Sequence, residues 1–269
     1  MKHILAYTLT ALLLCTTLCL GVFADEPITV YVTIADDNGA LVLAHEAITV
    51  TTDFDFDGTL SIADAIFCAH EAKFEGGADA GFACERTVYG LSLIKLWGID
   101  NGGSFGYYCN NASPMSLSDA IANGDSITVF AYTDLTMWSD TFCYFDAATA
   151  KATVGEELTL TLSSAGYDAE WNPVVYPVVG AVITVDGTDT EFVTDENGCV
   201  TLTLDEVGSY LISARSDTQT LVPPVCTVSV TNDVPYTGDN GWMVYAALCL
   251  ISVAAMAVLV ATRKRAYEK

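Results

Sequence analysis

An acidic loop between a strand pattern and a helix pattern is the feature that most limits the folds open to this chain. Before the loop, the segment 40–52 (ALVLAHEAITVTT) is rich in β-branched and apolar residues, and it follows an alternating segment, 28–35 (ITVYVTIA). The residues between them, 36–39 (DDNG), are typical of a hairpin turn. After the loop, apolar residues recur at helical spacing from Ser61 to Phe74, and two glycines follow. The folded part therefore begins with a β-hairpin and continues into a helix with one apolar face.

The loop itself, 53–64 (DFDFDGTLSIAD), has the spacing of a calcium-binding EF-hand loop, with Asp in place of Glu at the last position. Ca²⁺ takes about six to eight oxygen ligands, and crowded carboxylates repel one another unless a cation lies among them. The alternative is a solvated acidic turn whose carboxylates cap the helix. We predict bound Ca²⁺, with the glycine of the tight turn at Gly58 and the ligands Asp53, Asp55, Asp57, Thr59, Ser61 and Asp64.

The same loop also resembles one half of a dockerin, which likewise has no incoming helix. Dockerins carry two such loops, and the other acidic turn here, 100–103 (DNGG), lacks the later ligands. We therefore do not expect cohesin binding. We expect the ion to tie the end of the second strand to the start of the helix.

The segment 1–24 has the composition of a secretory signal peptide. A basic head precedes a long apolar run, and Val22 and Ala24 fit the −3 and −1 positions of a signal-peptidase site. An uncleaved membrane anchor would share the apolar run. The polar break after Ala24 favours cleavage at that residue, and hence export.

A second uncharged segment, 242–262, lies near the other end of the chain. At about 1.5 Å per helical residue it would span about 30 Å, the thickness of a bilayer core. Three basic residues, 263–265, follow it, which predicts a cytoplasmic tail. A plain single-pass anchor explains this pattern.

The residues before this span resemble the LPXTG sorting signal of Gram-positive surface proteins. The match consists of Val234, Pro235, Thr237 and Gly238, followed by a polar spacer, the apolar span and the basic tail, so that the signal covers 233–269. The resemblance implies that a sortase cleaves after Thr237 and joins it to peptidoglycan or another envelope acceptor. The Val at the first position leaves open which sortase acts.

Charge excludes several classes of partner. The chain holds 34 acidic and 10 basic residues, a formal net charge of −24, and five of the basic residues lie outside 25–237. Such a surface repels nucleic acid and anionic lipid. It suits a solvated exterior or one that binds cations.

The exported part contains six cysteines, which leaves three disulfides or six free thiols open. No CxxC pair or Cys/His cluster favours zinc, and the two histidines, His45 and His70, carry no nucleophile–base motif. We therefore predict no enzymatic activity. The cysteines are Cys68, Cys84, Cys109, Cys143, Cys199 and Cys226.

Three strand candidates follow the helix, which gives the element order of a β-grasp domain over 25–146. They are 104–110, 125–133 and 140–146. Residues 92–134 resemble the transcobalamin C-terminal-like family, through GYYCNN (106–111), NGDSI (123–127) and the preceding helix. The resemblance implies a fold that binds a soluble ligand. A cobalamin-like ligand is not itself indicated, because Asn111 replaces the usual Gly and the family's Trp-rich run is here Tyr-rich.

An aromatic and amide-rich stretch in this domain is the candidate ligand site. Adjacent residues of a strand point to opposite faces, so one of Tyr107 and Tyr108 should be exposed. Most aromatic residues here should belong to the core. An exposed tyrosine near Trp97, Asn110 and Asn111 would suit a sugar or a planar ligand.

The segment 147–232 contains short alternating strands separated by turns, the pattern of a β-sandwich. The stretch from Thr194 to Ala214 resembles the Ig-like and carboxypeptidase-regulatory-like modules of bacterial surface proteins. No catalytic constellation is present in it, and the resemblance implies a spacer.

Together these patterns predict a mostly β protein, with an α+β region first, an all-β sandwich second and a transmembrane helix last. We predict a non-enzymatic, calcium-stabilised protein on the Gram-positive cell surface that binds a soluble ligand, or a host or matrix partner. The alternative is a structural or adhesive stalk, or a pilin-like subunit, without a small-molecule site.

Overall fold

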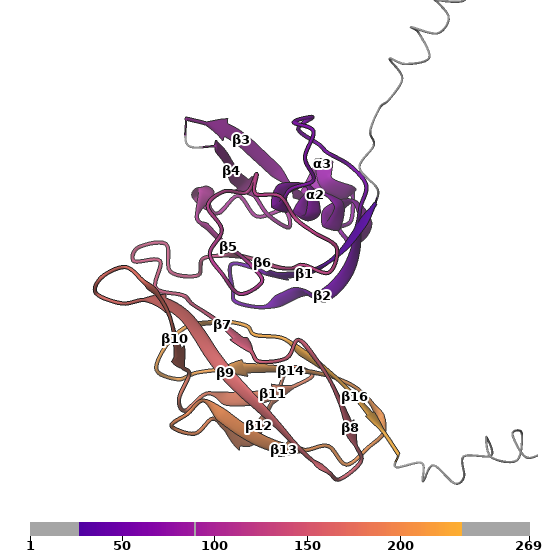
Figure 1. The fold of residues 1–269 in the computed structure, drawn as a ribbon, viewed down its shortest axis with the longest axis vertical. Helices are drawn as coiled ribbons and strands as arrows, with labels where there is room; N and C mark the ends of the chain where they lie inside the picture. Colours follow the sequence, from indigo (N-terminus) through magenta and orange to yellow (C-terminus); the bar gives the residue numbers. More distant parts are fainter. Residues whose placement is uncertain (1–26, 89, 233–269) are drawn as a thin grey trace, which may run out of the picture. The chain divides into compact units, whose positions relative to one another are not determined.

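The computed structural model describes residues 27–88 and 90–232, and these are mostly β-strand (Figure 1). The described residues up to Val230 belong to one compact unit. The predicted fold class, an α+β region followed by an all-β region, is confirmed. The predicted signal peptide, sorting signal and membrane span lie outside the described residues. Within those that are described, no helix combines the length and hydropathy needed to cross a bilayer.

The first region contains a four-stranded sheet in the order β2-β1-β6-β5. Strand β1 pairs antiparallel with β2 and parallel with β6, which pairs antiparallel with β5. Helix α2 packs against β1 and β2. A parallel central pair flanked by a hairpin and covered by one helix is the predicted β-grasp arrangement. The bounds are β1 Ile28–Ala35, β2 Leu41–Val50, α2 Ile62–Lys73, β5 Phe105–Cys109 and β6 Ser126–Ala131.

The core between this sheet and α2 follows from the two periodicities of the sequence. Strand residues that alternate toward one face and helix residues three or four apart meet in one apolar cluster. All of the following are at most 2% exposed: Val30, Val32, Ile48, Ile62, Ile66, Ala69, Ile127 and Val129.

Four elements between α2 and β5 differ from the sequence prediction of a single helix in this region. Helix α3 (Gly77–Gly81) has only five residues, too few for a helical period. Strands β3 (Ala83–Thr87) and β4 (Gly90–Lys95) form a separate hairpin. Most of β3 is exposed, so no buried face imposes the alternation by which strands are recognised. A short 3-10 turn, η1 (Asn101–Gly103), precedes β5.

His70 is a structural residue of α2. Its side chain is fully buried, its Nδ1 lies 2.7 Å from the Ile66 carbonyl oxygen, and its Nε2 accepts the Trp97 backbone N–H at 2.9 Å. Nδ1 therefore carries the proton of a neutral ring. Burial lowers the pKa of His70 more than the bond to Ile66 raises it. The histidine thus links α2 to the loop before η1.

This burial predicts a pH dependence of stability. An unfolded histidine titrates near 6.5, so the folded state binds fewer protons than the unfolded state below that pH. The free energy of unfolding should fall as the pH drops below about 6.5, by at most about 1.4 kcal/mol per pH unit for this group. Urea unfolding between pH 7.5 and 5 should show a shallower slope for His70→Gln than for His45→Gln, whose half-buried ring also has a lowered pKa. Equal slopes in the two variants would contradict this assignment.

The second region is a sandwich of two sheets around one apolar core. One sheet has the order β10-β9-β7-β15, with β13 also on β9, and the other has the order β12-β11-β14-β16-β8. The bounds are β7 Thr141–Phe145, β8 Thr149–Thr153, β9 Glu157–Tyr167, β10 Pro173–Pro177, β11 Val182–Val185, β12 Thr188–Val193, β13 Cys199–Thr203, β14 Gly208–Arg215, β15 Leu221–Val222 and β16 Cys226–Thr231.

Strand β7 pairs with β9 and β15, and therefore shares a sheet with the second region. The sequence pattern places this strand, as 140–146, in the first region. One partner, β9, follows after β8, which belongs to the other sheet, and the second partner, β15, lies about 80 residues after β7 in the chain, so no local pattern in the sequence indicates this pairing. The expected boundary after residue 146 stays a prediction, since both regions lie in one compact unit.

All six cysteines of the described residues are free thiols in this structure. Burial raises the pKa of Cys143 strongly and that of Cys226 to about 11, so both remain protonated at neutral pH. The Cys143 thiol donates to the Val222 carbonyl oxygen at 3.3 Å. These two cysteines act as core residues.

Candidate functional site

The acidic loop curls around Asp53. Its carboxylate accepts the backbone N–H groups of Asp57, at 3.2 Å, and of Gly58, at 2.8 Å. Gly58 has a φ of 88°, in the left-handed region where a residue without Cβ is favoured, as predicted for the tight turn. Desolvation alone would raise the pKa of Asp53, but these hydrogen bonds together outweigh it, and the pKa is lowered. The local sequence therefore shapes a turn that holds one ionised carboxylate in place.

Three of the predicted metal ligands converge in this turn. One carboxylate oxygen each from Asp53, Asp55 and Asp57 lie within 4.8 Å of one another. The Asp55 side chain is only 10% exposed, and its Oδ2 pairs with Arg86 at 2.7 Å. Its Oδ1 is buried and has no hydrogen-bond partner within the described parts of the chain. An unpartnered buried carboxylate oxygen is costly, which makes this atom the natural ligand of a cation.

The electrostatics of Asp55 agree with its geometry. Burial raises its pKa, the charges of Asp57 and Asp64 add to the rise, and Arg86 offsets only part of it. The site therefore carries more negative charge than its own cation neutralises. Hard carboxylate oxygens on a tight turn are the donors that Ca²⁺ prefers, so the residues present fit that ion.

Ser61 and Asp64, which were predicted as metal ligands, cap the N-terminus of helix α2 in this structure. Ser61 is the N-cap of α2, its Oγ accepts the Asp64 backbone N–H, and the Asp64 Oδ2 accepts the Ser61 backbone N–H at 2.8 Å. The Asp64 Oδ1 accepts the Phe54 N–H at 2.8 Å. Asp lacks one methylene relative to the Glu usual at this position, and at N3 of the helix it completes a capping box. The capping alternative of the sequence analysis thus holds for this residue, and metal ligation by Ser61 and Asp64 stays a prediction.

Two further residues border the loop. Thr59 is exposed, and its backbone N–H donates to Asp57 Oδ1 at 2.9 Å. Burial, with a further contribution from the charges of Asp55 and Asp64, raises the pKa of Cys84 to about 12. Ca²⁺ takes hard oxygen ligands, so a thiol that is protonated in the metal-free protein is a poor ligand for this ion. The donors at this site are therefore oxygens.

The five predicted ligand-binding residues do not form one site. Trp97 packs on the helix side, with its ring 5.1 Å from His70 and 5.2 Å from Phe74. Tyr107 also packs against the core under α2. Tyr108 lies on the opposite face of the sheet, where its ring stacks on Phe142 at 3.6 Å. The two tyrosines point to opposite faces, as their adjacency on a strand predicted.

Asn110 and Asn111 follow Tyr108 and both have left-handed backbones, with φ of 50° and 63°. The Asn110 side chain donates to Asp125 at 2.9 Å and accepts the Ser126 N–H at 2.9 Å. It therefore ties the end of β5 to the start of β6. The Asn111 side chain has no hydrogen-bond partner among the described residues, so it is available to a ligand.

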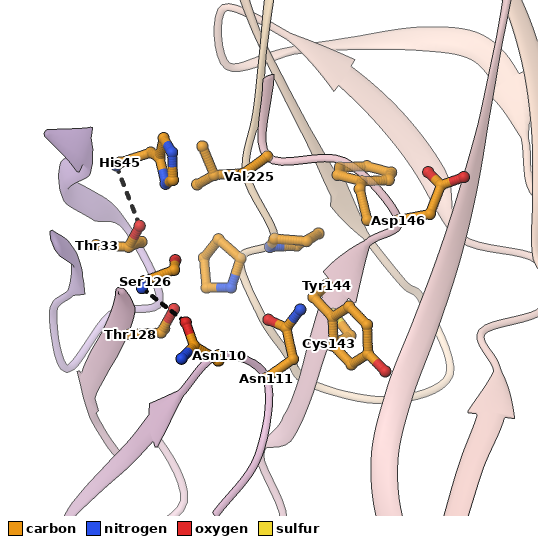
Figure 2. Close-up of a pocket in the computed structure, with 14 residues that line it drawn as sticks. Thr33, His45, Asn110, Asn111, Ser126, Thr128, Cys143, Tyr144, Asp146 and Val225 are labelled. Carbon is orange, nitrogen blue, oxygen red and sulfur yellow. Dashed lines mark hydrogen bonds between the residues drawn. The ribbon is translucent and has the colours of Figure 1, made fainter. Parts of the chain in front are cut away.

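A polar hollow of about 220 Å³ lies beside these amides (Figure 2). Figure 2 shows Thr33, His45, Ser126 and Thr128 on one wall and Tyr144 on another. The His45 ring stacks on Tyr31 at 4.5 Å. The sequence did not indicate these polar wall residues as a binding site. Polar side chains at alternate positions of a strand are also typical of an ordinary solvent-facing sheet.

The residues that line this hollow are not arranged as a nucleophile with its base. Burial lowers the pKa of His45, which makes the neutral ring a potential base. Cys143, the thiol among the lining residues, is buried and donates to a backbone carbonyl. The hollow offers hydrogen-bonding groups and no activated nucleophile.

Comparison with protein-family models gives no match, and no curated protein is similar. Among solved structures, the N-terminal four Ig domains of Dscam1 isoform 4.44 align with 55% of this chain at 14% identity, with a TM-score of 0.23. The N-terminal Ig1-2 module of the Drosophila receptor protein tyrosine phosphatase DLAR aligns with 56% of this chain and 74% of that chain, at 12% identity and a TM-score of 0.25. The chain spans about a third of the Dscam1 fragment, 32%. TM-scores this low say nothing about function.

Proposed function

We propose that this chain is a non-enzymatic protein displayed on a Gram-positive envelope, whose β-grasp region is stabilised by Ca²⁺ and binds a soluble ligand or a partner molecule. The buried, unpartnered Asp55 Oδ1 among three converging carboxylates is the observation that carries the proposal. Export and anchoring rest on the two terminal sequence patterns. The transcobalamin-like and LPXTG-like resemblances support the same reading.

Calcium at this loop would act on stability. The loop joins β2 to α2, so an ion held there fixes the end of a strand to the start of the helix that covers the sheet. Suppose the dissociation constant is about 10⁻⁴ M, as in extracellular modules, and the ion is at about 1 mM. The folded state then gains about 1.4 kcal/mol. That is a useful part of a domain's net stability.

The test compares thermal unfolding of the purified chain in 1 mM Ca²⁺ and in chelator. We expect a melting temperature about 3–5 °C higher with Ca²⁺. Asp55→Asn keeps the shape of the side chain and removes its charge, so it should abolish most of the shift. Asp168→Asn is the matched control, because Asp168 accepts two backbone N–H groups in an acidic turn, as Asp53 does, but belongs to no carboxylate cluster among the described residues.

Two outcomes would contradict the proposal in different ways. Equal melting curves in Ca²⁺ and chelator would remove the metal, and the acidic turn would then be only a helix-capping loop. A calcium shift without binding of any soluble ligand would favour the structural or adhesive stalk.

A further inference from the structure

We propose that Tyr108 and Asn111 of the first region, together with the β9–β10 hairpin, form a binding site for a neutral saccharide. This inference rests on the ligand-binding part of the proposed function and names its site and its ligand class. The hollow has a volume of about 310 Å³, at the lower end of the range for small-molecule sites. It adjoins the hollow of Figure 2, with which it shares Asn111.

The walls of this site are aromatic. Tyr108 is held against Phe142, 3.6 Å away, so its ring is fixed in the apolar cluster that joins β5, β6 and β7. Tyr167, at the end of β9, forms a second wall and is 52% exposed. The Trp171 ring lies 6.2 Å from that of Tyr167 and extends the aromatic surface past the rim. Rigid rings with one polar edge suit a ligand that has an apolar face and hydroxyl groups.

Polar groups at the walls have no protein partner among the described residues. These are the hydroxyls of Tyr108, Tyr167 and Ser113 and the amide of Asn111. The Tyr108 and Tyr167 hydroxyls lie near enough that Tyr167 contributes, after burial and Tyr132, to the raised pKa of Tyr108. The four groups supply both donors and acceptors, as a polyhydroxylated ring requires.

Charge decides the class of saccharide. No residue that lines this hollow is charged, although the chain as a whole has a net charge of −24. An anionic sugar would meet long-range repulsion without a local cation, and a cationic ligand would find no carboxylate at the walls. A neutral sugar needs neither. The uncharged lining therefore fits a neutral saccharide better than any charged ligand.

The backbone is shaped for this placement. The left-handed pair Asn110–Asn111 turns the chain after β5, and the side chain of the first member is already used in bonds to Asp125 and Ser126. The second member is thereby presented at the hollow with a free amide. Ala165 and Gly166, which also line the hollow, are the small residues just before Tyr167.

The experiment titrates the purified full chain by calorimetry with cellohexaose, laminarihexaose, xylohexaose, mannohexaose and chitohexaose, and with sialyllactose as the anionic comparison. We expect at least one neutral hexaose to bind and sialyllactose not to bind. Tyr167→Ala should weaken binding at least tenfold. Asn111→Gly removes the amide and tolerates the left-handed backbone, and it should weaken binding about fivefold.

Tyr176→Ala is the matched control. Tyr176 lies on β10, is exposed to a similar extent at 49%, and does not line the hollow. The Tyr176→Ala variant should bind the saccharide with the affinity of the wild type. Absence of binding by every neutral hexaose, or equal losses in Tyr176→Ala and Tyr167→Ala, would overturn the proposal. Cobinamide is titrated as a further comparison, and cobinamide binding that Tyr167→Ala abolishes would overturn the saccharide class.

Repeating the titration in chelator separates this inference from the metal. Saccharide binding without a calcium shift would leave this site standing and remove the calcium part of the proposed function. A calcium-dependent shift of the melting temperature without hexaose binding would remove the saccharide site and leave the calcium part of the proposed function.

Discussion

Gly198→Ala is expected to lower the free energy of unfolding of the sandwich by about 3 kcal/mol. Gly198 ends the turn between β12 and β13 and has a φ of 74°. A Cβ there would lie 2.4 Å from the Leu162 carbonyl oxygen and 3.3 Å from Pro177 Cα, and both neighbours are backbone atoms. Real Cβ atoms do not approach an oxygen so closely, so the chain must shift.

The neighbouring backbone has little freedom to move away. The Leu162 N–H donates to the Gly198 carbonyl at 2.8 Å, and the Leu162 carbonyl accepts the Val178 N–H at 3.0 Å. Leu162 itself is fully buried. Relief of the clash therefore breaks a hydrogen bond or displaces a core residue, at a cost of about 1–3 kcal/mol beyond that of the backbone conformation.

Gly187→Ala isolates the steric contribution. Gly187 has nearly the same φ, 77°, but a Cβ there would meet nothing within 4 Å. This variant should lose only the about 1–2 kcal/mol of a left-handed alanine. Urea unfolding of both variants gives the comparison. Equal losses of unfolding free energy in the two variants would contradict the close contact between Gly198 and β9.

Turn chemistry explains why much of the fold was predictable from the sequence. In the turn after β1, the Asp36 carboxylate accepts the N–H groups of Asn38 and Ala40. In the turn after β12, the Asp195 carboxylate accepts those of Asn197 and Cys199 in the same pattern. Asp and Asn at these offsets form turns by themselves. Strands joined by such turns, and the amphipathic α2, were therefore predicted close to their observed bounds.

Elements that depend on distant partners were not predictable. Strand β15 has two residues and pairs in parallel with β7, about 80 positions earlier in the chain. Strand β10 begins and ends with proline, which argues against a central strand and is tolerated because β10 lies at a sheet edge. Neither has a local period that could identify it. Their positions follow only from the packed sandwich.

The two candidate sites differ in the same way: one is formed by neighbouring residues, and the other needs strands that are distant in sequence. The carboxylate cluster lies within one turn, so spacing alone predicted that Asp53, Asp55 and Asp57 would converge. The hollow at Tyr108 needs β9 and β10, which follow it by more than 50 residues in sequence. Strand alternation predicted that one tyrosine would leave the helix side of the sheet. It could not predict what that tyrosine would meet.

Phe130→Ala is expected to cost about 3–5 kcal/mol of the free energy of unfolding, the largest single effect proposed for this chain. Phe130 is 2% exposed and belongs to the apolar cluster with Ala35, Phe142 and Val222. Its ring lies in edge contact with Tyr132 at 5.0 Å and parallel to Tyr108 at 6.5 Å. Loss of the ring would leave a cavity beneath Tyr108, so saccharide affinity should fall together with stability.

A double-mutant cycle with Gly106 makes this expectation specific. Gly106 pairs with Phe130 across β5 and β6, and a Cβ there would lie 2.2 Å from the ring's Cζ. Gly106→Ala alone should therefore destabilise by about 2 kcal/mol through overpacking. In the Phe130→Ala background the same change should be neutral, or stabilising by about 0.4–1 kcal/mol, because the ring is gone and alanine restricts the unfolded chain. Urea unfolding of the four proteins should thus give a coupling energy of about 2–3 kcal/mol. Additive losses would mean that the Phe130 ring does not lie on Gly106, and the position of Tyr108 above the hollow would need another cause.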